Sequence, residues 1–152
     1  MSESSGPSAG HRIVVGTDGS ASSTDALRWA ARIAADTGAH IDAVTCWQYP
    51  RNYGMLVGAS GWDPAADAAK IVADSITTVF GDHHPDGLRT YVREGHPAQV
   101  LIDAADGADM LVLGSRGHGG FVGLLLGSVS AYCAEHGRCP VVVVPPAHPT
   151  AD

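Results

Sequence analysis

The feature that most restricts the fold of this chain is a regular alternation of two apolar patterns. Short runs rich in β-branched residues occur at 12–17, 40–47, 88–94, 110–113 and 141–144. Stretches with helical character lie between them, at 20–36, from Asp63-Pro64 to Gly81, from Pro97 to near Gly107, and from Gly127 to about Arg138. Because parallel neighbouring strands need a crossover connection, this alternation predicts an α/β fold with a doubly wound, five-stranded parallel sheet and helices on both faces.

The helices are also expected to show a buried side. For the first helix, the spacing of apolar residues selects Ala26, Trp29, Ala30 and Ile33. For the second, Asp63 and Pro64 are a good N-cap and N1 pair, Gly81 marks the end, and the expected apolar face holds Ala69, Val72, Ile76, Val79 and Phe80.

Composition excludes several partners. Nine Lys+Arg against sixteen Asp+Glu give a formal charge of −7, which argues against duplex nucleic acid and an anionic membrane surface. The longest apolar runs fall far short of the roughly 18 residues of a membrane span. Residues 1–11 lack the basic and apolar regions of a secretory signal, and three cysteines are too few for a disulfide framework, so we expect a cytoplasmic protein with reduced thiols. One domain at 12–146 is predicted, between flexible tails at 1–11 and 147–152.

Two predicted strand ends carry unusual residues. The first is followed by Thr17, Asp18, Gly19 and Ser20, and the fourth by a glycine-rich loop: six of the nineteen glycines lie between 114 and 127. Glycine lets backbone N–H groups approach an anion closely, and Gly127-Ser128 opens a predicted helix whose free N–H groups favour negative charge. The loop is neither a Walker A motif, because its lysine is missing, nor GxGxxG, because Val122 stands where the last glycine is needed.

The pattern that does match is G-x2-G-x9-G-[ST], formed by Gly114, Gly117, Gly127 and Ser128. It resembles the nucleotide-binding signature of the ATP-binding universal stress proteins. The resemblance covers nearly the whole chain, through VVGTDGSASSTDALRWAARIA, LVLGSRGHGGFVGLLLGSVS and CPVVVVPP. It implies a Rossmann-like sheet with strand order 3-2-1-4-5, a nucleotide-dependent role in stress response or signalling, ATP with Mg²⁺ or Mn²⁺ between strands one and four, and a homodimer formed through Val141–Val144.

The resemblance also implies roles for single residues. Asp18 is expected near the ribose, with Thr17 and Gly19 in the same loop, and a backbone group at about Cys46 near the adenine. The phosphates are assigned to the glycine signature, with Val129 as a further backbone donor: Gly114, Gly117, Gly127 and Ser128. Arg116 and His118 fall at variable positions of the signature, where each could contact a phosphate or face solvent.

Alternatives stay open at several positions. Asp18 could cap the first helix instead, a role that Ser20 would fill equally well. Cys133, His136 and Cys139 have the spacing C-x2-H-x2-C, but no fourth zinc ligand is close in sequence, so a helix end before the last strand is favoured. Aromatic residues around the loop at 48–61 are either a lid or part of the core edge: Trp47, Tyr49, Tyr53 and Trp62.

The sequence favours binding over catalysis. It contains no nucleophile elbow, no paired carboxylates at a shared site and no lysine near the glycine loop, so slow ATP hydrolysis is the most that is expected. The alternatives are a weak ATPase, a binder of another adenine nucleotide such as cyclic AMP, and an interaction module that binds no nucleotide.

Overall fold

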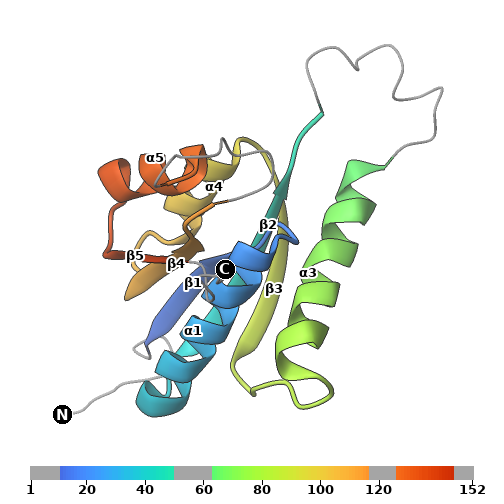
Figure 1. The fold of residues 1–152 in the computed structure, drawn as a ribbon, viewed down its shortest axis with the longest axis vertical. Coiled ribbons are helices and arrows are strands. Elements are labelled where there is room, and N and C mark those ends of the chain that lie inside the picture. The colour runs from blue at the N-terminus through green and yellow to red at the C-terminus, as the bar shows by residue number, and fades with distance from the viewer. Residues whose placement is uncertain (1–10, 50–62, 117–125, 146–152) are drawn as a thin grey trace, which may run out of the picture.

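A computed structural model describes residues 11–49, 63–116 and 126–145 of the chain. The elements follow one another as β1 (Arg12–Gly16), α1 (Ala21–Thr37), β2 (His40–Trp47), α3 (Pro64–Phe80), β3 (Leu88–Glu94), α4 (Pro97–Ala104), β4 (Met110–Gly114), α5 (Ser128–His136) and β5 (Val141–Val144). The five strands are all parallel, in the order β3-β2-β1-β4-β5. The predicted doubly wound α/β fold and its strand order are confirmed (Figure 1).

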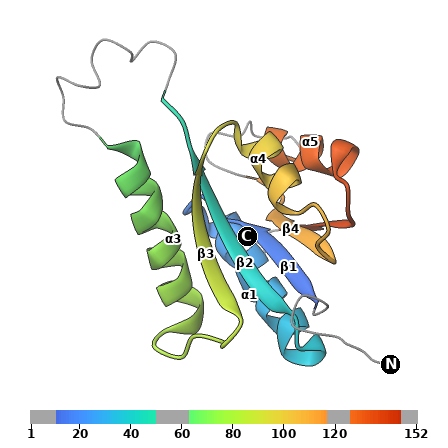
Figure 2. The ribbon, with the colours of Figure 1, turned by 180° about the vertical axis from the view of Figure 1, so that it is seen from behind.

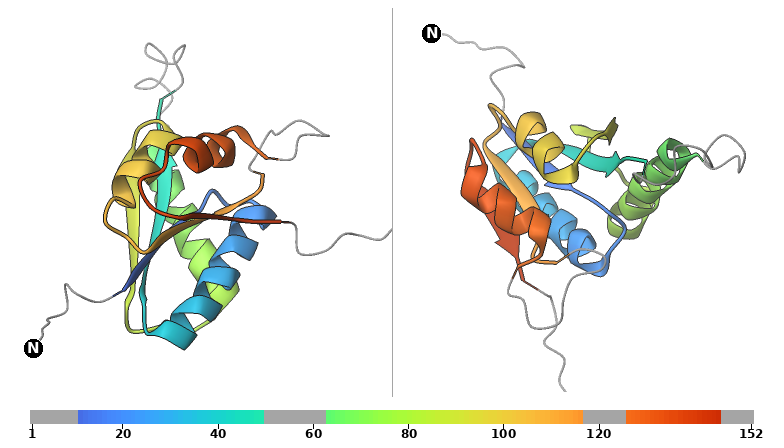
Figure 3. Two further views of the ribbon diagram at one scale, coloured as in Figure 1. Left: turned by 90° about the vertical axis from the view of Figure 1, so that its left-hand side faces the viewer. Right: turned by 90° about the horizontal axis from the view of Figure 1, so that it is seen from above.

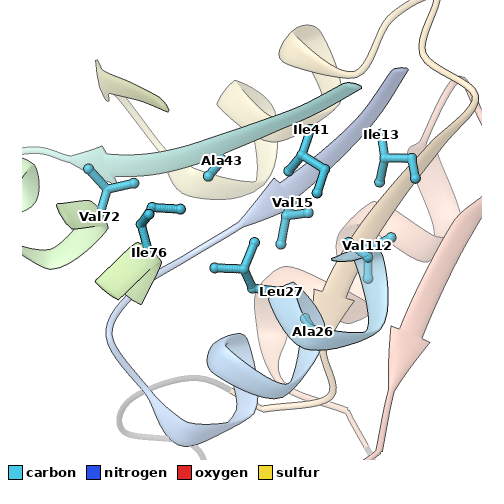
Figure 4. Close-up of a cluster of buried hydrophobic side chains, with 10 residues drawn as sticks. Ile13, Val15, Ala26, Leu27, Ile41, Ala43, Val72, Ile76 and Val112 are labelled. Atoms are coloured by element: carbon cyan, nitrogen blue, oxygen red, sulfur yellow. The ribbon is translucent and has the colours of Figure 1, made fainter. Parts of the chain in front are cut away.

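Helices α1 and α3 cover one face of the sheet. Ile13 and Val15 of β1 alternate with residues of the opposite face, and they meet Leu27 of α1 and Ile76 of α3. Figure 4 shows these side chains converging between the sheet and the two helices. All four are at most 3% exposed, so this layer is a continuous dry core.

Helices α4 and α5 lie on the other face. The two edge-on views in Figure 3 separate this pair from α1 and α3. Leu101 and Ile102 of α4 pack with Val14 and Leu111 of the central strands, and Cys133 of α5 is fully buried there. The strands β1 and β4 are therefore covered on both faces, as their unbroken apolar sequences predict.

Each of the two predicted helix faces contains one wrong residue. Trp29 is 40% exposed, and Leu27 takes the inward position on α1. On α3, Ala68 is buried and Ala69 is exposed. The buried face of α1 is formed by Ser23, Ala26, Leu27 and Ala30, and at about 100° per residue Trp29 falls outside it. The Trp29 ring lies 5.1 Å from the Arg32 guanidinium carbon.

The start of α3 is as predicted. Asp63 is the N-cap, and its Oδ1 accepts hydrogen bonds from the backbone N–H groups of Ala65 and Ala66 at 3.1 and 3.2 Å. Gly81 follows the helix with a φ of +60°, a value that suits glycine.

Among the residues that the structure describes, no helix combines the length and the apolar character that a bilayer crossing requires.

Candidate functional site

The carboxyl ends of β1 and β4 lie side by side at one edge of the sheet. The two strands are paired in parallel, with Val15 opposite Val112. Beyond their ends, the backbone N–H of Arg116 donates to Ser22 Oγ at 3.2 Å, which ties the loop after β4 to the first turn of α1. The structure therefore brings together the two loops that the sequence selects as ligand-binding.

Thr17, directly after β1, is hydrogen-bonded to the neighbouring strand β2. Its backbone N–H donates to the Val44 carbonyl at 2.8 Å, and its hydroxyl lies 2.5 Å from that of Thr45. With only 4% of its surface exposed, Thr17 joins the ends of β1 and β2. Gly19 in the same loop has a φ of +84°, so this turn needs a residue that tolerates the left-handed region.

Ser20, rather than Asp18, is the N-cap of α1. Ser20 Oγ accepts a hydrogen bond from the Ser23 backbone N–H at 3.1 Å. Asp18 supports that cap, because its Oδ1 accepts from the Ser20 backbone N–H at 2.9 Å and from the Ser20 hydroxyl at 2.5 Å. The carboxylate of Asp18 is thus held at the site edge, half-exposed, where its predicted contact with a ribose remains a prediction.

Gly114 has a packing role of its own. A Cβ added at this position would lie 2.2 Å from Ser22 Oγ and 2.6 Å from the Ser22 carbonyl carbon and oxygen. The absence of a side chain is what lets the first turn of α1 rest on the end of β4. The signature glycine therefore shapes the site even before any phosphate contact is considered.

The start of α5 is fastened to the end of β4. The Gly127 backbone N–H donates to the Ser115 carbonyl at 2.6 Å. The buried Ser130 hydroxyl lies 3.1 Å from both the Ser115 and the Gly127 carbonyl oxygens, to which it donates. Helix α5 is held in position by its first turn.

No side chain among the described residues caps α5. Its N-cap is Gly127, which has no side chain to accept from the first N–H groups, and the Ser128 side chain is exposed. The first N–H groups of a helix have no intrahelical acceptor and carry partial positive charge. The binding of phosphates at Ser128 and Val129 remains a prediction, and the uncapped start of this helix is compatible with it.

Other predicted contacts are only partly described. Arg116 is exposed on the loop after β4, and Gly117 and His118 lie outside the described residues. The same holds for most of the loop at 48–61, including Tyr53, and for Trp62. Trp47 and Tyr49, at its start, pack edge to face with ring centroids 5.4 Å apart.

Cys46 sits near the carboxyl end of β2, opposite Arg93 of β3. Burial, and to a smaller extent the charge of Cys133, raise the pKa of its thiol to about 12. The thiol is therefore protonated at neutral pH, and the backbone contact of Cys46 with adenine that the resemblance implies remains a prediction.

The zinc alternative gains no support from the described residues. Cys133 lies on the buried side of α5, and its Sγ donates to the Ala98 carbonyl at 3.7 Å. Burial raises the pKa of this thiol to about 11. His136 is exposed and lies against the Tyr132 ring. Within 11–49, 63–116 and 126–145, no cluster of three or more His, Cys, Asp or Glu side chains could hold a metal ion.

Sequence reasoning missed the serines that build this edge. Ser22, Ser23 and Ser130 provide hydroxyl contacts between the loops and helix starts. Ser115 is 5% exposed, and its Oγ has no hydrogen-bond partner among the described residues. The only available signal was the density of serine after the two strands, which on its own is also typical of ordinary turns.

The family model for the universal stress protein family matches residues 10–145. This chain belongs to the universal stress protein family. Two mycobacterial relatives support the assignment: a universal stress protein of Mycolicibacterium smegmatis, 36% identical over 142 residues, and one of Mycobacterium tuberculosis strain H37Rv, 31% identical over 148 residues. The alignments cover 87% and 91% of this chain but 47% and 49% of those proteins, so the chain spans about half the length of the curated relatives it matches.

Solved structures agree on the fold. The universal stress protein UspA of Lactobacillus plantarum superposes with a TM-score of 0.74 at 23% identity, covering 88% of this chain and 97% of that one. A universal stress protein crystallised in complex with cAMP gives a TM-score of 0.64 at 27% identity, covering 90% of this chain and 98% of that one.

Proposed function

We propose that this universal stress protein binds ATP, with the phosphates at the N-terminus of α5 and a divalent ion, Mg²⁺ or Mn²⁺, bound to the nucleotide. The observation that carries the proposal is that Gly127 leaves the first turn of α5 without a side-chain cap while Ser115 and Ser130 fix that turn at the end of β4. A fixed helix end with available N–H donors is a preorganised phosphate site.

The remaining contacts follow the loops that meet at this edge. Asp18, braced by Ser20, would accept from ribose hydroxyls, and the backbone at Cys46 would meet the adenine. Thr17 and Gly19 flank Asp18 and shape the turn in which it lies. Gly114 would let the backbone approach the phosphates, together with Gly117, while Arg116 and His118 would supply positive charge from the loop.

The preference for an adenine nucleotide draws on relatives. The structure at 27% identity was determined with cAMP, and a family member from Arabidopsis thaliana was determined with AMP bound. Binding through backbone N–H groups and a nucleotide-bound metal ion needs few Lys or Arg side chains, so the net charge of −7 is compatible with ATP. Binding without a catalytic base suits a protein that reports nucleotide state in a stress response.

Calorimetric titration with Mg-ATP, Mn-ATP and cAMP tests the proposal. We expect ATP to bind, and Ser128→Glu to weaken it about tenfold or more by placing a carboxylate beside the phosphates. Ser128→Gln, which has the same size without the charge, should weaken it far less. If cAMP binds and ATP does not, the ligand of this site is the cyclic nucleotide instead of ATP. If no nucleotide gives a heat of binding at roughly millimolar concentration, the proposal is contradicted.

We further propose a homodimer formed through β5. This strand lies at the edge of the sheet, and the carbonyls of Pro140 and Val144 accept from Leu111 of β4 and from Ser115, the residue after it. Because backbone groups alternate along a strand, the N–H and C=O of Val141 and Val143 point to the open edge. A half-exposed run of four valines with unused ladder groups favours pairing with a second copy about a two-fold axis.

The matched variants Val143→Pro and Val143→Thr test whether the outward backbone groups of β5 are needed for the dimer. Proline removes an outward N–H that β4 does not use, whereas threonine keeps it. Light scattering behind a sizing column should give a dimer for the wild type and for Val143→Thr, and a lower mass for Val143→Pro. A wild-type mass near 15.6 kDa at micromolar concentration would contradict the dimer.

The proposal also places the protein in the cytoplasm. Its three cysteines are free in the structure, as a reducing compartment would keep them.

A further inference from the structure

A second polar site lies on the α4 side of the sheet, over β2 and β3. Figure 2 views this side, with β2 and β3 in front and α4 beside them. A hollow of about 290 Å³ opens here, lined by Arg12, Asp42, Val44, Arg89, Tyr91, Arg93 and Ala104. Its centre is distinct from the site at the carboxyl ends of β1 and β4, because Arg12, Asp42 and Arg89 lie in the amino-terminal parts of β1, β2 and β3. Of the lining residues only Arg93, which is paired with Cys46, lies near the carboxyl end of its strand.

The floor of this hollow is a charge cluster around Asp42, whose side chain is only 7% exposed. Arg89 donates to both Asp42 oxygens, from Nε at 3.1 Å and from a terminal nitrogen at 3.4 Å. Arg12 donates to Asp42 at 3.3 Å and to the Ala104 and Asp106 carbonyls at 3.0 Å each. Arg12 is thus occupied in holding the end of α4, while Arg89, with 55% of its side chain exposed, reaches the surface.

The wall is formed by alternate residues of β3. Arg89, Tyr91 and Arg93 share one face of the strand, and the guanidinium carbons of the two arginines lie 5.9 and 4.6 Å from the Tyr91 ring centroid. In the described parts of the chain, no carboxylate pairs with Arg93. The aromatic ring holds both guanidinium groups in place, which lowers the entropy cost of ordering them around a ligand.

The charge of the hollow exceeds what Asp42 requires. Three guanidinium groups against one carboxylate leave an excess of positive charge, in a protein whose net charge is −7. One arginine would neutralise Asp42, and nine Lys and Arg side chains are all that the sequence contains. Concentrating three of them in one hollow beside an aromatic ring matches the chemistry that recognises phosphate and carboxylate groups.

We propose that this hollow is a second ligand site, which binds a small organic anion with its phosphate or carboxylate between Arg89 and Arg93 and a flat apolar part against the half-buried Tyr91 ring. Its volume is near the lower end of the range for ligand pockets, roughly 300 Å³, so the ligand is a single ring or a molecule of similar size. The site does not depend on nucleotide binding at α5.

Nuclear magnetic resonance of the full chain can read the two sites separately, with phenyl phosphate as the probe. The signals of the Arg89 and Arg93 side-chain Nε–H groups and of the Tyr91 ring report on the hollow, and the amides of Ser128–Ser130 report on α5. We expect saturating shifts at the hollow with phenyl phosphate, weaker ones with inorganic phosphate and none with phenol. These shifts should persist when Mg-ATP is present in excess, and they should appear even if ATP fails to bind.

Two matched variants test whether binding of phenyl phosphate depends on the position of the arginines in the hollow or only on the net charge of the protein. Arg93→Gln should weaken phenyl phosphate binding about tenfold. Arg32→Gln removes the same charge from another guanidinium that lies over an aromatic ring, 5.1 Å from the Trp29 centroid, and should leave binding within about twofold.

Three results would overturn the proposal. The first is the absence of shifts at Arg89 and Arg93 up to about 10 mM phenyl phosphate. The second is an equal loss of binding in both variants, which would indicate nonspecific attraction. The third is a response to a short oligoglutamate peptide without one to phenyl phosphate, which would make the hollow a contact for an acidic protein segment.

Discussion

Two helices begin at the same edge of the sheet, and their N-termini are prepared differently. At α1, Ser20 caps the first turn and Asp18 braces the cap. At α5, Gly127 occupies the N-cap position and no described side chain accepts from the first turn. In the sequence, both helices come after a strand and a segment that contains glycine and serine, so the sequence makes them look alike. The capping state distinguishes them: the first turn of α1 has a side-chain acceptor, whereas no described side chain accepts from the first N–H groups of α5, to which we assign the ligand in our proposal.

The largest effect is expected where the two loops touch. Gly114→Ala should lower the free energy of unfolding by about 2–3 kcal/mol, because the new Cβ meets the Ser22 backbone at 2.6 Å. Gly87→Ala is the matched control: its Cβ meets the His40 ring at 2.5 Å, and that side chain can rotate away. Urea denaturation measures both. Equal losses would show that the α1 contact with β4 is no tighter than an ordinary loop contact.

The second-largest effect is expected when the start of α5 loses its hydrogen bonds to the end of β4. Ser130→Ala removes the buried hydroxyl that donates to the Ser115 and Gly127 carbonyls, which should cost about 1–2 kcal/mol of stability. Because the helix end then loses its fixed position, ATP affinity should fall several-fold as well. Ser75→Ala, which removes another buried serine hydroxyl on the distant helix α3, serves as the control for affinity. Stability loss in Ser130→Ala with unchanged ATP affinity would separate the anchoring of α5 from ligand binding.

Removing the cap of α1 should affect stability more than ATP binding. Ser20→Ala is expected to lower stability by about 1 kcal/mol, the usual value of an N-cap, and to weaken ATP binding less than Ser128→Ala does, through the lost support of Asp18 alone. Ser128→Ala at the start of α5 should do the reverse, with little change in melting temperature and weaker ATP binding. If both variants lost stability and neither lost affinity, the contrast between the two helix ends would be wrong.

The smallest expected effect is an increase in stability. Ser128→Glu places a carboxylate in the first turn of a helix that has no acidic residue there, which should raise stability by about 0.3–1 kcal/mol in the absence of nucleotide. Thermal unfolding at low salt, compared with Ser128→Gln, measures it. A lower melting temperature for the glutamate variant than for the glutamine variant would indicate that the end of α5 is not electropositive.

The backbone framework was accessible from sequence because it depends on local patterns. The unbroken run Met110–Leu113 predicts a strand covered on both faces, which is confirmed, whereas the similar run Val141–Val144 is only partly buried at the edge of the sheet. Asp63-Pro64 starts a helix through its own capping chemistry. Helix faces were less accessible, since Ala26 and Ala30 fit a face completed by Trp29 as well as one completed by Leu27, and only the orientation of α1 on the sheet decides between them. The strand order followed from the family resemblance.

The site was only partly accessible. The glycine signature located the loops, but the choice of Ser20 over Asp18 as the cap depends on the geometry of the turn, and the link from Arg116 to Ser22 joins residues far apart in the sequence. The hollow around Arg89 and Arg93 gave no sequence signal, because an alternating strand with charged residues on one side also describes an ordinary wet sheet face.

The most direct test of the contrast is a backbone amide titration with Mg-ATP by nuclear magnetic resonance. The account predicts the largest shifts at Ser128, Val129 and Ser130, and smaller ones at the first turn of α1, whose Ser23 N–H stays bonded to Ser20. Largest shifts at Ser22–Thr24, or no shift at either helix with roughly millimolar ATP, would contradict it.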